Sequence, residues 1–200
     1  MALLGSGGRG RGRFLAAAPP AAHLGLGLLL AGSLGAGLRG QTAGEYQVKA
    51  AFLFNFAKFV EWPRPDPAGE AINLCVVGDD PFGGVLDQMV KGKLVNGRSV
   101  EVQRIAAAGK IESCDMAFLG ASERKRIPAI LEGLGRAGVL TVGETEDFTR
   151  QGGVIGFFLD GNHVRFEVNL DAAERARLKI SSKLLNLAKI VRNPPAGGRS

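Results

Sequence analysis

The chain has 200 residues, of which 46% are hydrophobic and 22% are charged. This composition excludes a mainly disordered chain, a collagen-like repeat and a polytopic membrane protein. The formal net charge is +6, but residues 1–43 hold four arginines and no acid, so the other 157 residues carry 21 basic and 19 acidic side chains. That near balance provides no dense basic face, and we expect no nucleic-acid partner.

Residues 1–43 have the pattern of a secretory signal peptide. Three arginines precede an apolar run over 24–38 that no acid interrupts. The run is shorter than the roughly 20 residues of a membrane-spanning helix. We therefore expect a cleaved signal, with its cleavage position open, and an exported periplasmic protein. A signal anchor is the competing interpretation, and no cysteine lies near the junction for lipid attachment.

Two cysteines lie beyond the signal region. Cys75 belongs to a strand-like run over 72–77, and Cys114 directly precedes another over 115–119. In an oxidising compartment, two strand-associated cysteines predict a structural disulfide, with two buried free thiols as the alternative. The one histidine left after the signal, His163, is too few for a zinc site with these thiols. We expect no metal and no cofactor.

In chain order, the first predicted element after the signal is a helix over 46–60. Phe52, Phe56 and Phe59 recur at helical spacing. Phenylalanines in this segment also alternate as in a strand, but the length of the segment favours a helix. Polar residues are few, so the helix either packs into the core, which we expect, or offers a face to a partner. Trp62-Pro63 ends it.

The middle of the chain alternates apolar strand-like runs with amphipathic stretches. Strands are predicted over 72–77, 100–105, 115–119 and 139–142, helices over 82–90 and 123–136, and a loop or short helix over 106–113. Continuous apolar runs suit strands that are covered on both faces. The alternation predicts an α/β fold with a mixed, largely parallel central sheet flanked by helices.

The end of the chain differs, because residues 154–168 predict a C-terminal antiparallel hairpin with a turn at 160–162. A short helix capped by Asn169 or Asp171, a small strand over 178–181 and a last helix should follow. Ser182 should cap that last helix, whose inward residues would be Leu184, Leu187, Ala188 and Val191. We expect a single domain over 44–191 and a flexible tail over 192–200.

No catalytic set stands out, and we expect no enzyme. The sequence has no serine-nucleophile elbow and no phosphate-binding Gly-Lys loop. Asp79 and Asp80 follow the first strand of the predicted sheet, where open α/β sheets bind ligands. Such a pair could hold Mg²⁺ or exchange protons. The preferred interpretation is an acidic loop in which Asp80 caps the next helix and Pro81 occupies its first position.

The segment from Tyr46 to Pro63, YQVKAAFLFNFAKFVEWP, resembles the opening segment of the YfiR family. Later segments fit the same pattern, namely 75–79 (CVVGD), 114–115 (CD), 152–157 (GGVIGF), 165–169 (RFEVN) and 180–185 (ISSKLL). By this resemblance Cys75 and Cys114 match a family disulfide. A second family cysteine pair has no counterpart here, because Thr149 and Gly156 occupy the matching positions.

The resemblance implies a non-catalytic regulator. Family members are periplasmic and dimeric, with an α/β fold. The best-known member inhibits an inner-membrane diguanylate cyclase by binding its periplasmic sensor region, which lowers cyclic di-GMP and biofilm formation. An outer-membrane lipoprotein can sequester that member and release the cyclase. For this chain the resemblance implies a diguanylate cyclase or a sensor kinase as target, the lipoprotein as competitor, and a homodimer.

A pocket near the C-terminal hairpin is also implied, in which Glu167 matches an acidic position. Arg165, Phe166, Glu167 and Lys179 form the expected partner or ligand patch, with Phe166 as its hydrophobic centre and charges of both signs around it. Without the resemblance, the charged members would be read as cross-strand ion pairs. The alternative function is a small-ligand-binding module that serves a sensor kinase or receptor.

Overall fold

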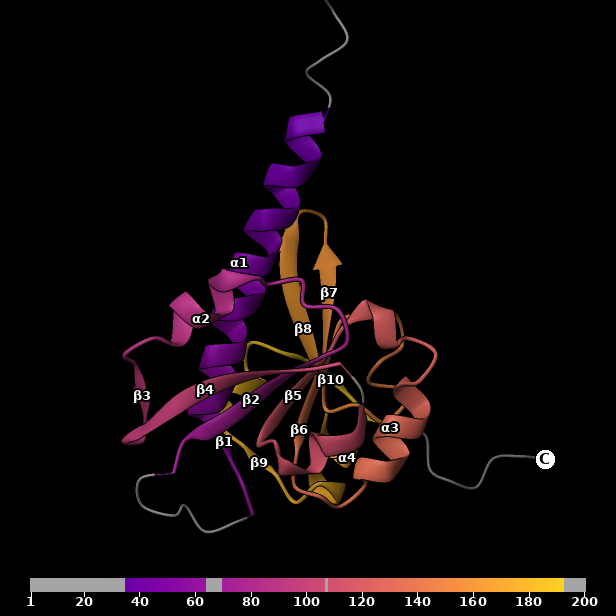
Figure 1. The fold of residues 1–200 in the computed structure, drawn as a ribbon. Coiled ribbons are helices and arrows are strands. Elements are labelled where there is room, and N and C mark those ends of the chain that lie inside the picture. Colours follow the sequence, from indigo (N-terminus) through magenta and orange to yellow (C-terminus); the bar gives the residue numbers. More distant parts are fainter. Residues whose placement is uncertain (1–34, 64–69, 107, 193–200) are drawn as a thin grey trace, which may run out of the picture.

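An eight-stranded sheet forms the centre of the computed structural model, which describes residues 35–63, 70–106 and 108–192 (Figure 1). Its spatial order is β10-β8-β7-β6-β5-β2-β4-β3. The strands are β2 (Ile72–Val77), β3 (Leu94–Val95), β4 (Arg98–Ile105), β5 (Met116–Leu119), β6 (Leu140–Gly143), β7 (Ile155–Asp160), β8 (His163–Asn169) and β10 (Lys189–Val191).

The sheet is mixed and mostly parallel, which confirms the predicted fold class. Strands β4, β2, β5, β6 and β7 run parallel to one another. β7 and β8 form the predicted antiparallel hairpin, which closes through a two-residue loop with positive φ at Gly161. β3 adds an antiparallel edge to β4, and β10 joins the other edge parallel to β8.

Helix α1 (Gly35–Phe59) crosses one face of the sheet, and helix α3 (Ile127–Leu134) covers the other (Figure 1). A hydrophobic core lies on each face of the sheet. Successive side chains of β2 point to opposite faces, so Val76 packs in the core on the α1 side and Val77 in the core on the α3 side. Phe56 is fully buried, so this side of α1 belongs to the core as expected. Within the described ranges, no helix combines the length and the apolar character needed to cross a membrane.

The predicted helix over 46–60 is confirmed, and it begins further upstream than predicted, at Gly35. The predicted end of the signal at residue 43 therefore falls inside α1, while residues 1–34 lie outside the described residues. After α1 the chain forms β1 (Val60–Glu61), which pairs with β9 (Lys179–Ile180) in a separate antiparallel two-stranded sheet. The predicted small strand over 178–181 is thus confirmed.

The middle helices are shorter than the apolar pattern suggests. Helix α2 (Gly84–Val90) starts two residues later than predicted. The predicted helix over 123–136 is a 3₁₀ turn, η2 (Ala121–Glu123), followed by α3. Pro128 lies in the first turn of α3, where its missing N–H costs no hydrogen bond. The segment left open as loop or helix contains a 3₁₀ helix, η1 (Ala108–Ser113).

The prediction of a long last helix is wrong. Helix α5 (Ser182–Leu185) ends after four residues and is capped by Ser181 rather than Ser182. Leu187, expected to face inward, is 70% exposed. Residues 189–191 form β10 instead, because their main chain completes hydrogen bonds on the open edge of β8. Helix α4 (Leu170–Arg175) is capped by Asn169, whose Oδ1 accepts from the Ala172 N–H over 3.0 Å.

The predicted flexible tail over 192–200 falls almost entirely outside the described residues. Its first residue, Arg192, is described, and its Nη1 lies 3.1 Å from Asp171 Oδ1.

Candidate functional site

The usual ligand position of an open α/β sheet lies between β2 and β5, where the chain order reverses. Here the loops after these two strands press against each other. The Asp79 N–H donates to Ser122 Oγ over 2.9 Å. A Cβ on Gly120 would lie only 3.0 Å from the Asp79 carbonyl oxygen. The crevice between the strand ends is therefore closed by the chain itself.

The Asp80 carboxylate is held by its own neighbours. Its Oδ1 accepts from the Phe82 N–H over 2.7 Å, and its Oδ2 from Arg104 Nε over 2.8 Å. Arg104 also donates to Asp87, which holds the pKa of the Asp87 carboxyl below its ordinary value. Asp80 closes the turn before α2 rather than capping it, since the helix begins at Gly84. These contacts fit the structural interpretation of the acidic loop.

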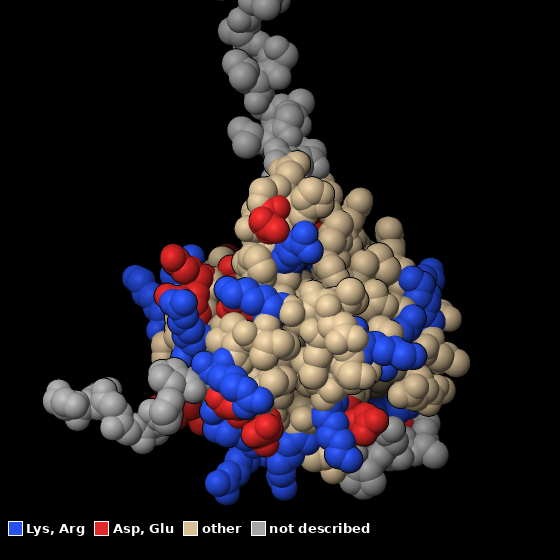
Figure 2. All heavy atoms as spheres, turned by 180° about the vertical axis from the view of Figure 1, so that it is seen from behind, with Lys and Arg blue, Asp and Glu red and all other residues tan. Residues whose placement is uncertain are grey.

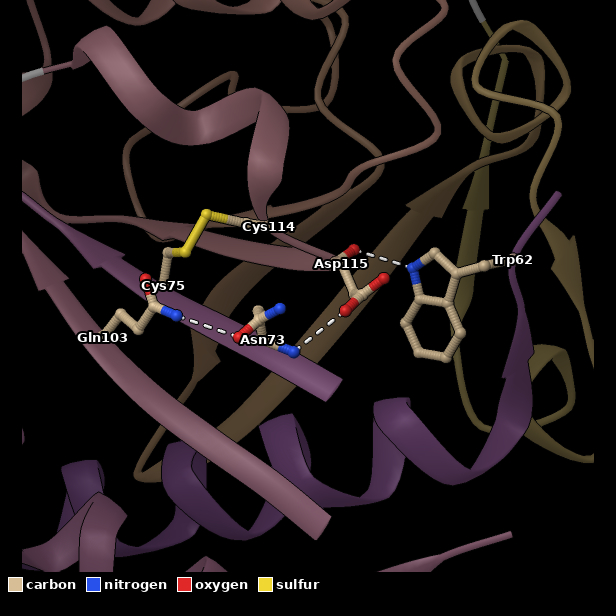
Figure 3. The surroundings of a disulfide bond; sticks show 6 residues. All are labelled: Trp62, Asn73, Cys75, Gln103, Cys114 and Asp115. Atoms are coloured by element: carbon tan, nitrogen blue, oxygen red, sulfur yellow. Dashed lines mark hydrogen bonds between the residues drawn. A yellow bond between two sulfur atoms is a disulfide. The ribbon is translucent and has the colours of Figure 1, made fainter. Parts of the chain in front are cut away.

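The predicted disulfide between Cys75 and Cys114 is present (Figure 3). Both cysteines are fully buried in the core under α3, with Cα atoms 6.1 Å apart. Beside the bridge, the Asp115 carboxylate accepts from the Asn73 N–H over 2.9 Å, and the Asp115 carbonyl from Trp62 Nε1 over 2.7 Å. A bridge so enclosed has a structural role.

The four predicted hairpin residues do not gather in one patch. Arg165 and Glu167 point to the outer face of the hairpin, away from α1. Phe166 points the opposite way and is 3% exposed, because it packs against two phenylalanine rings of α1. Lys179 lies on β9, with its Nζ 4.0 Å from a carboxylate oxygen of Glu61. Phe166 is therefore a core residue and not the hydrophobic centre of a surface patch.

A groove of about 360 Å³ lies on the outer face of the hairpin, between the 145–150 loop and strands β7, β8 and β10. We call it the hairpin groove. The Glu167 carboxylate accepts from the Thr149 hydroxyl and from Lys189 Nζ, the latter over 3.1 Å. Lys189 Nζ also lies 5.5 Å from the centroid of the Phe158 ring. Charges of both signs around a half-buried ring suit a partner side chain or a small amphoteric ligand.

The predicted site includes neither Phe158 nor Lys189, although one sequence pattern could have indicated Phe158. Period-two alternation is a signal that points to Phe158, since the hairpin register pairs it with Arg165 on the outer face. No comparable signal exists for Lys189. It lies beside Glu167 only because β10 pairs with β8, a long-range contact that local periodicity does not contain.

The positions that match the second family cysteine pair adjoin beneath the hairpin groove, which Gly156 lines while Thr149 is fully buried. A Cβ on Gly156 would lie 3.0 Å from Thr149 Cγ2 and 3.5 Å from Glu167 Cγ. The Thr149 hydroxyl donates to the Glu167 carboxylate, and Thr149 is fully buried. A hydrogen bond between a threonine and a carboxylate thus stands where the resemblance places a disulfide.

The double substitution T149C/G156C is expected to form a disulfide on oxidation. Closing so short a loop stabilises the fold by roughly 2 kcal/mol in the chain-entropy model, less about 1 kcal/mol for the lost hydrogen bond to Glu167. Thiol titration and thermal melting of the oxidised and reduced forms would measure this. The single variants T149C and G156C are the controls. Two free thiols after oxidation would show that the positions do not adjoin.

A buried charge cluster fixes α1 next to the hairpin groove. Lys49 is 5% exposed, and its Nζ donates to Glu144 Oε2 over 2.6 Å and pairs with Glu45. The Tyr46 hydroxyl donates to Glu144 Oε1 over 3.2 Å. Burial and the nearby Glu144 carboxylate raise the pKa of Tyr46, so its hydroxyl remains a donor. Since Glu144 directly precedes the groove loop, the cluster ties this loop to α1.

Exposed apolar side chains lie beside α1, on the side opposite the hairpin groove. Phe157 points to α1, so Leu159, two residues further on, faces the same side, and it is 56% exposed. Ile190 is 44% exposed and contributes to both surfaces, since it pairs in register with Val168 of the α1-side core and also lines the hairpin groove. Seen from behind, the molecule shows a broad uncharged surface bordered by basic residues and, in places, by acidic ones (Figure 2). Such a surface, here called the α1 face, is typical of a protein–protein contact.

Residues 46–189 match a family model described as YfiR/HmsC-like. Two solved structures are similar at 10% identity. A conserved domain protein from Vibrio cholerae has a TM-score of 0.47 over 74% of this chain and 59% of that chain. The ABC domain from Streptococcus pneumonia, in complex with L-Trp, has a TM-score of 0.43 over 60% and 56%.

This chain spans less than two thirds of the length of either solved structure. The family model, in contrast, runs from within α1 into β10 and includes the disulfide and all of the hairpin groove except Ile190 and Val191. The chain belongs to the YfiR/HmsC-like family of periplasmic regulators of signalling.

Proposed function

We propose that this protein is a non-catalytic periplasmic regulator that inhibits an inner-membrane diguanylate cyclase by binding its periplasmic sensor region. Cyclic di-GMP and biofilm formation then fall. The observation that carries the proposal is the family match over residues 46–189. The buried disulfide supports an oxidising compartment. Export through a cleaved signal, a homodimer, and sequestration by an outer-membrane lipoprotein belong to the same proposal.

The hairpin groove is the contact we assign to the target. Inhibition requires only that the protein bind one state of the cyclase more tightly than the other. Arg165 and Lys189 offer exposed cations beside the partly buried Phe158 ring, which pairs with Arg165 in the hairpin register and lies 5.5 Å from Lys189 Nζ. A lipoprotein that removes free protein from the pool would release the cyclase by mass action. The uncharged α1 face remains for the second copy of a dimer.

Charge reversal at Lys189 should weaken capture of the target by about tenfold, because it places two carboxylates together in the groove. The full gene with a C-terminal tag is expressed in its own cell, cross-linked, and purified from detergent-solubilised membranes. Mass spectrometry should find a membrane protein with a periplasmic region and a cyclase domain. Lys183→Glu is the matched control, since Lys183 is exposed on α5 outside the groove.

Deletion of the gene should raise cyclic di-GMP, and complementation with the wild type or Lys183→Glu should lower it again. Lys189→Glu should fail to do so at equal protein level. Unchanged cyclic di-GMP after deletion, with no cyclase among the captured proteins, would contradict the proposal. Capture of a sensor kinase instead of a cyclase would keep the assignment as a regulator but replace the diguanylate cyclase with a kinase as its target.

A second candidate function is a small-ligand-binding module that serves a sensor kinase or receptor. The observation in its favour is the volume of the hairpin groove, about 360 Å³, with Glu167 at its base. This size is at the lower end of small-molecule sites. Binding of a small molecule without any membrane partner in the capture experiment would favour this function over inhibition.

A further inference from the structure

A second cavity, of about 300 Å³, lies between α3 and α4 at the start of β6. None of its lining residues belongs to the hairpin groove. Most of its wall is aliphatic and comes from both helices and the sheet. The apolar members are Leu131, Leu134, Val139, Val154, Ala172 and Ala176. Four polar side chains also line it, namely Glu132, Thr141, Gln151 and Arg175, and Pro128, Gly135 and Gly152 complete the lining. The Thr141 hydroxyl already accepts from the Val154 N–H over 3.0 Å.

Arg175 is the cation of this cavity, and within the described part of the chain its guanidinium makes no hydrogen bond or ion pair. This differs from Arg104 and Arg165, whose guanidinium groups both pair with carboxylates. The 152 position is a glycine with φ of +106°, and a Cβ there would lie 3.7 Å from Arg175 Nη2. The guanidinium therefore lies against bare main chain, with its donors unused by side chains.

Glu132 lies on the α3 wall of the same cavity and is exposed. Like Arg175, it has no hydrogen bond or ion pair among the described residues. The negative charge of Glu132 would repel a second negative charge on a ligand that already pairs one carboxylate with Arg175. A dicarboxylate or a phosphate would face this repulsion. It would also lack an apolar part to contact the aliphatic residues of the cavity.

We propose that this cavity binds a small monocarboxylate with an apolar body. The planar guanidinium of Arg175 presents paired donors that match the two oxygens of a carboxylate. The aliphatic residues of α3 and α4 cover the rest of the molecule and remove its apolar surface from water. The volume limits the occupant to a small molecule. This inference does not depend on the target contact at the hairpin groove.

The probe is 3-phenylpropionate, titrated into full-length oxidised protein and followed by amide chemical shifts. Shifts should concentrate at Gly135, Gly152 and Ala176. The neutral analogue 3-phenylpropanol should bind at least tenfold more weakly, because it cannot pair with the guanidinium. Arg175→Gln should lower the affinity for the acid about tenfold and leave that for the alcohol unchanged.

Arg124→Gln is the matched control, since Arg124 is exposed, lies outside this cavity, and has no side-chain partner among the described residues. Its affinity for the acid should equal that of the wild type. Equal affinity in Arg175→Gln would overturn the proposal, as would shifts at Gly156 and Lys189 instead, or no shifts at millimolar probe. Lys189→Glu should bind the probe normally, which separates this site from the proposed function.

Discussion

Removing the disulfide with the double substitution C75A/C114A should lower the free energy of unfolding by about 4 kcal/mol. The bridge joins residues 39 positions apart, and the chain-entropy model gives about that value for a loop of this length. Both cysteines are fully buried, so the substitution also removes two sulfur atoms from the core under α3. For a chain of this size, the loss corresponds to a fall in Tm of roughly 10 °C.

Thermal melting of the wild type with and without reductant, beside the double variant, measures this effect. The reduced wild type should melt close to the variant, and reductant should leave the variant unchanged. Equal melting of the oxidised wild type and the variant would mean that the bridge contributes nothing. The double variant is preferable to a single one, because a single substitution leaves a buried thiol free to form mixed disulfides.

Replacing Phe56 with alanine should destabilise the protein by about 3–5 kcal/mol, the usual cost of deleting a fully buried aromatic ring. Phe56 is fully buried in the seam between α1 and the hairpin. Its ring centroid lies 5.7 Å from that of Phe157 and 5.1 Å from that of Phe166. The substitution therefore leaves a cavity between two elements that are far apart in the sequence, and few local contacts can refill it.

Phe158→Ala is the matched control, because Phe158 is the same residue type and lies on the hairpin against which Phe56 packs, but it is only partly buried, on the outer face. It should cost less than about 1.5 kcal/mol, since much of its ring already contacts water. Urea denaturation of both variants, analysed with a common m-value, gives the comparison. Similar costs for the two would show that α1 does not pack on the hairpin as described.

The disulfide and the aromatic seam stabilise the parts of the fold that carry the hairpin groove and the cavity between α3 and α4. The disulfide holds the α3 side of the sheet, and the aromatic seam holds α1 against the hairpin. The cluster of Lys49, Tyr46 and Glu144 then connects α1 to the loop of the hairpin groove. A protein that binds a partner through a rigid groove gains affinity, because its side chains and loops lose less conformational entropy on binding.

Local patterns in the sequence determine most of the elements. The apolar runs of β2, β5 and β6 predict buried parallel strands, because such strands bury both of their faces. The spacing of phenylalanines predicts α1, and two strand-associated cysteines predict the disulfide that the structure contains. Each of these signals is carried by residues close together in the chain.

Only the tertiary structure decided the composition of the site. Phe166 is buried because α1 covers that face of the hairpin, so the ring that remains partly exposed beside it is Phe158, on the other side. Lys189 joins Glu167 because the open edge of β8 recruits residues 189–191 into a strand, where local periodicity favours a helix. The sequence by itself therefore determined the fold class and the disulfide. Which faces remain exposed depends on long-range pairing of main-chain hydrogen bonds, and local residue patterns do not encode it.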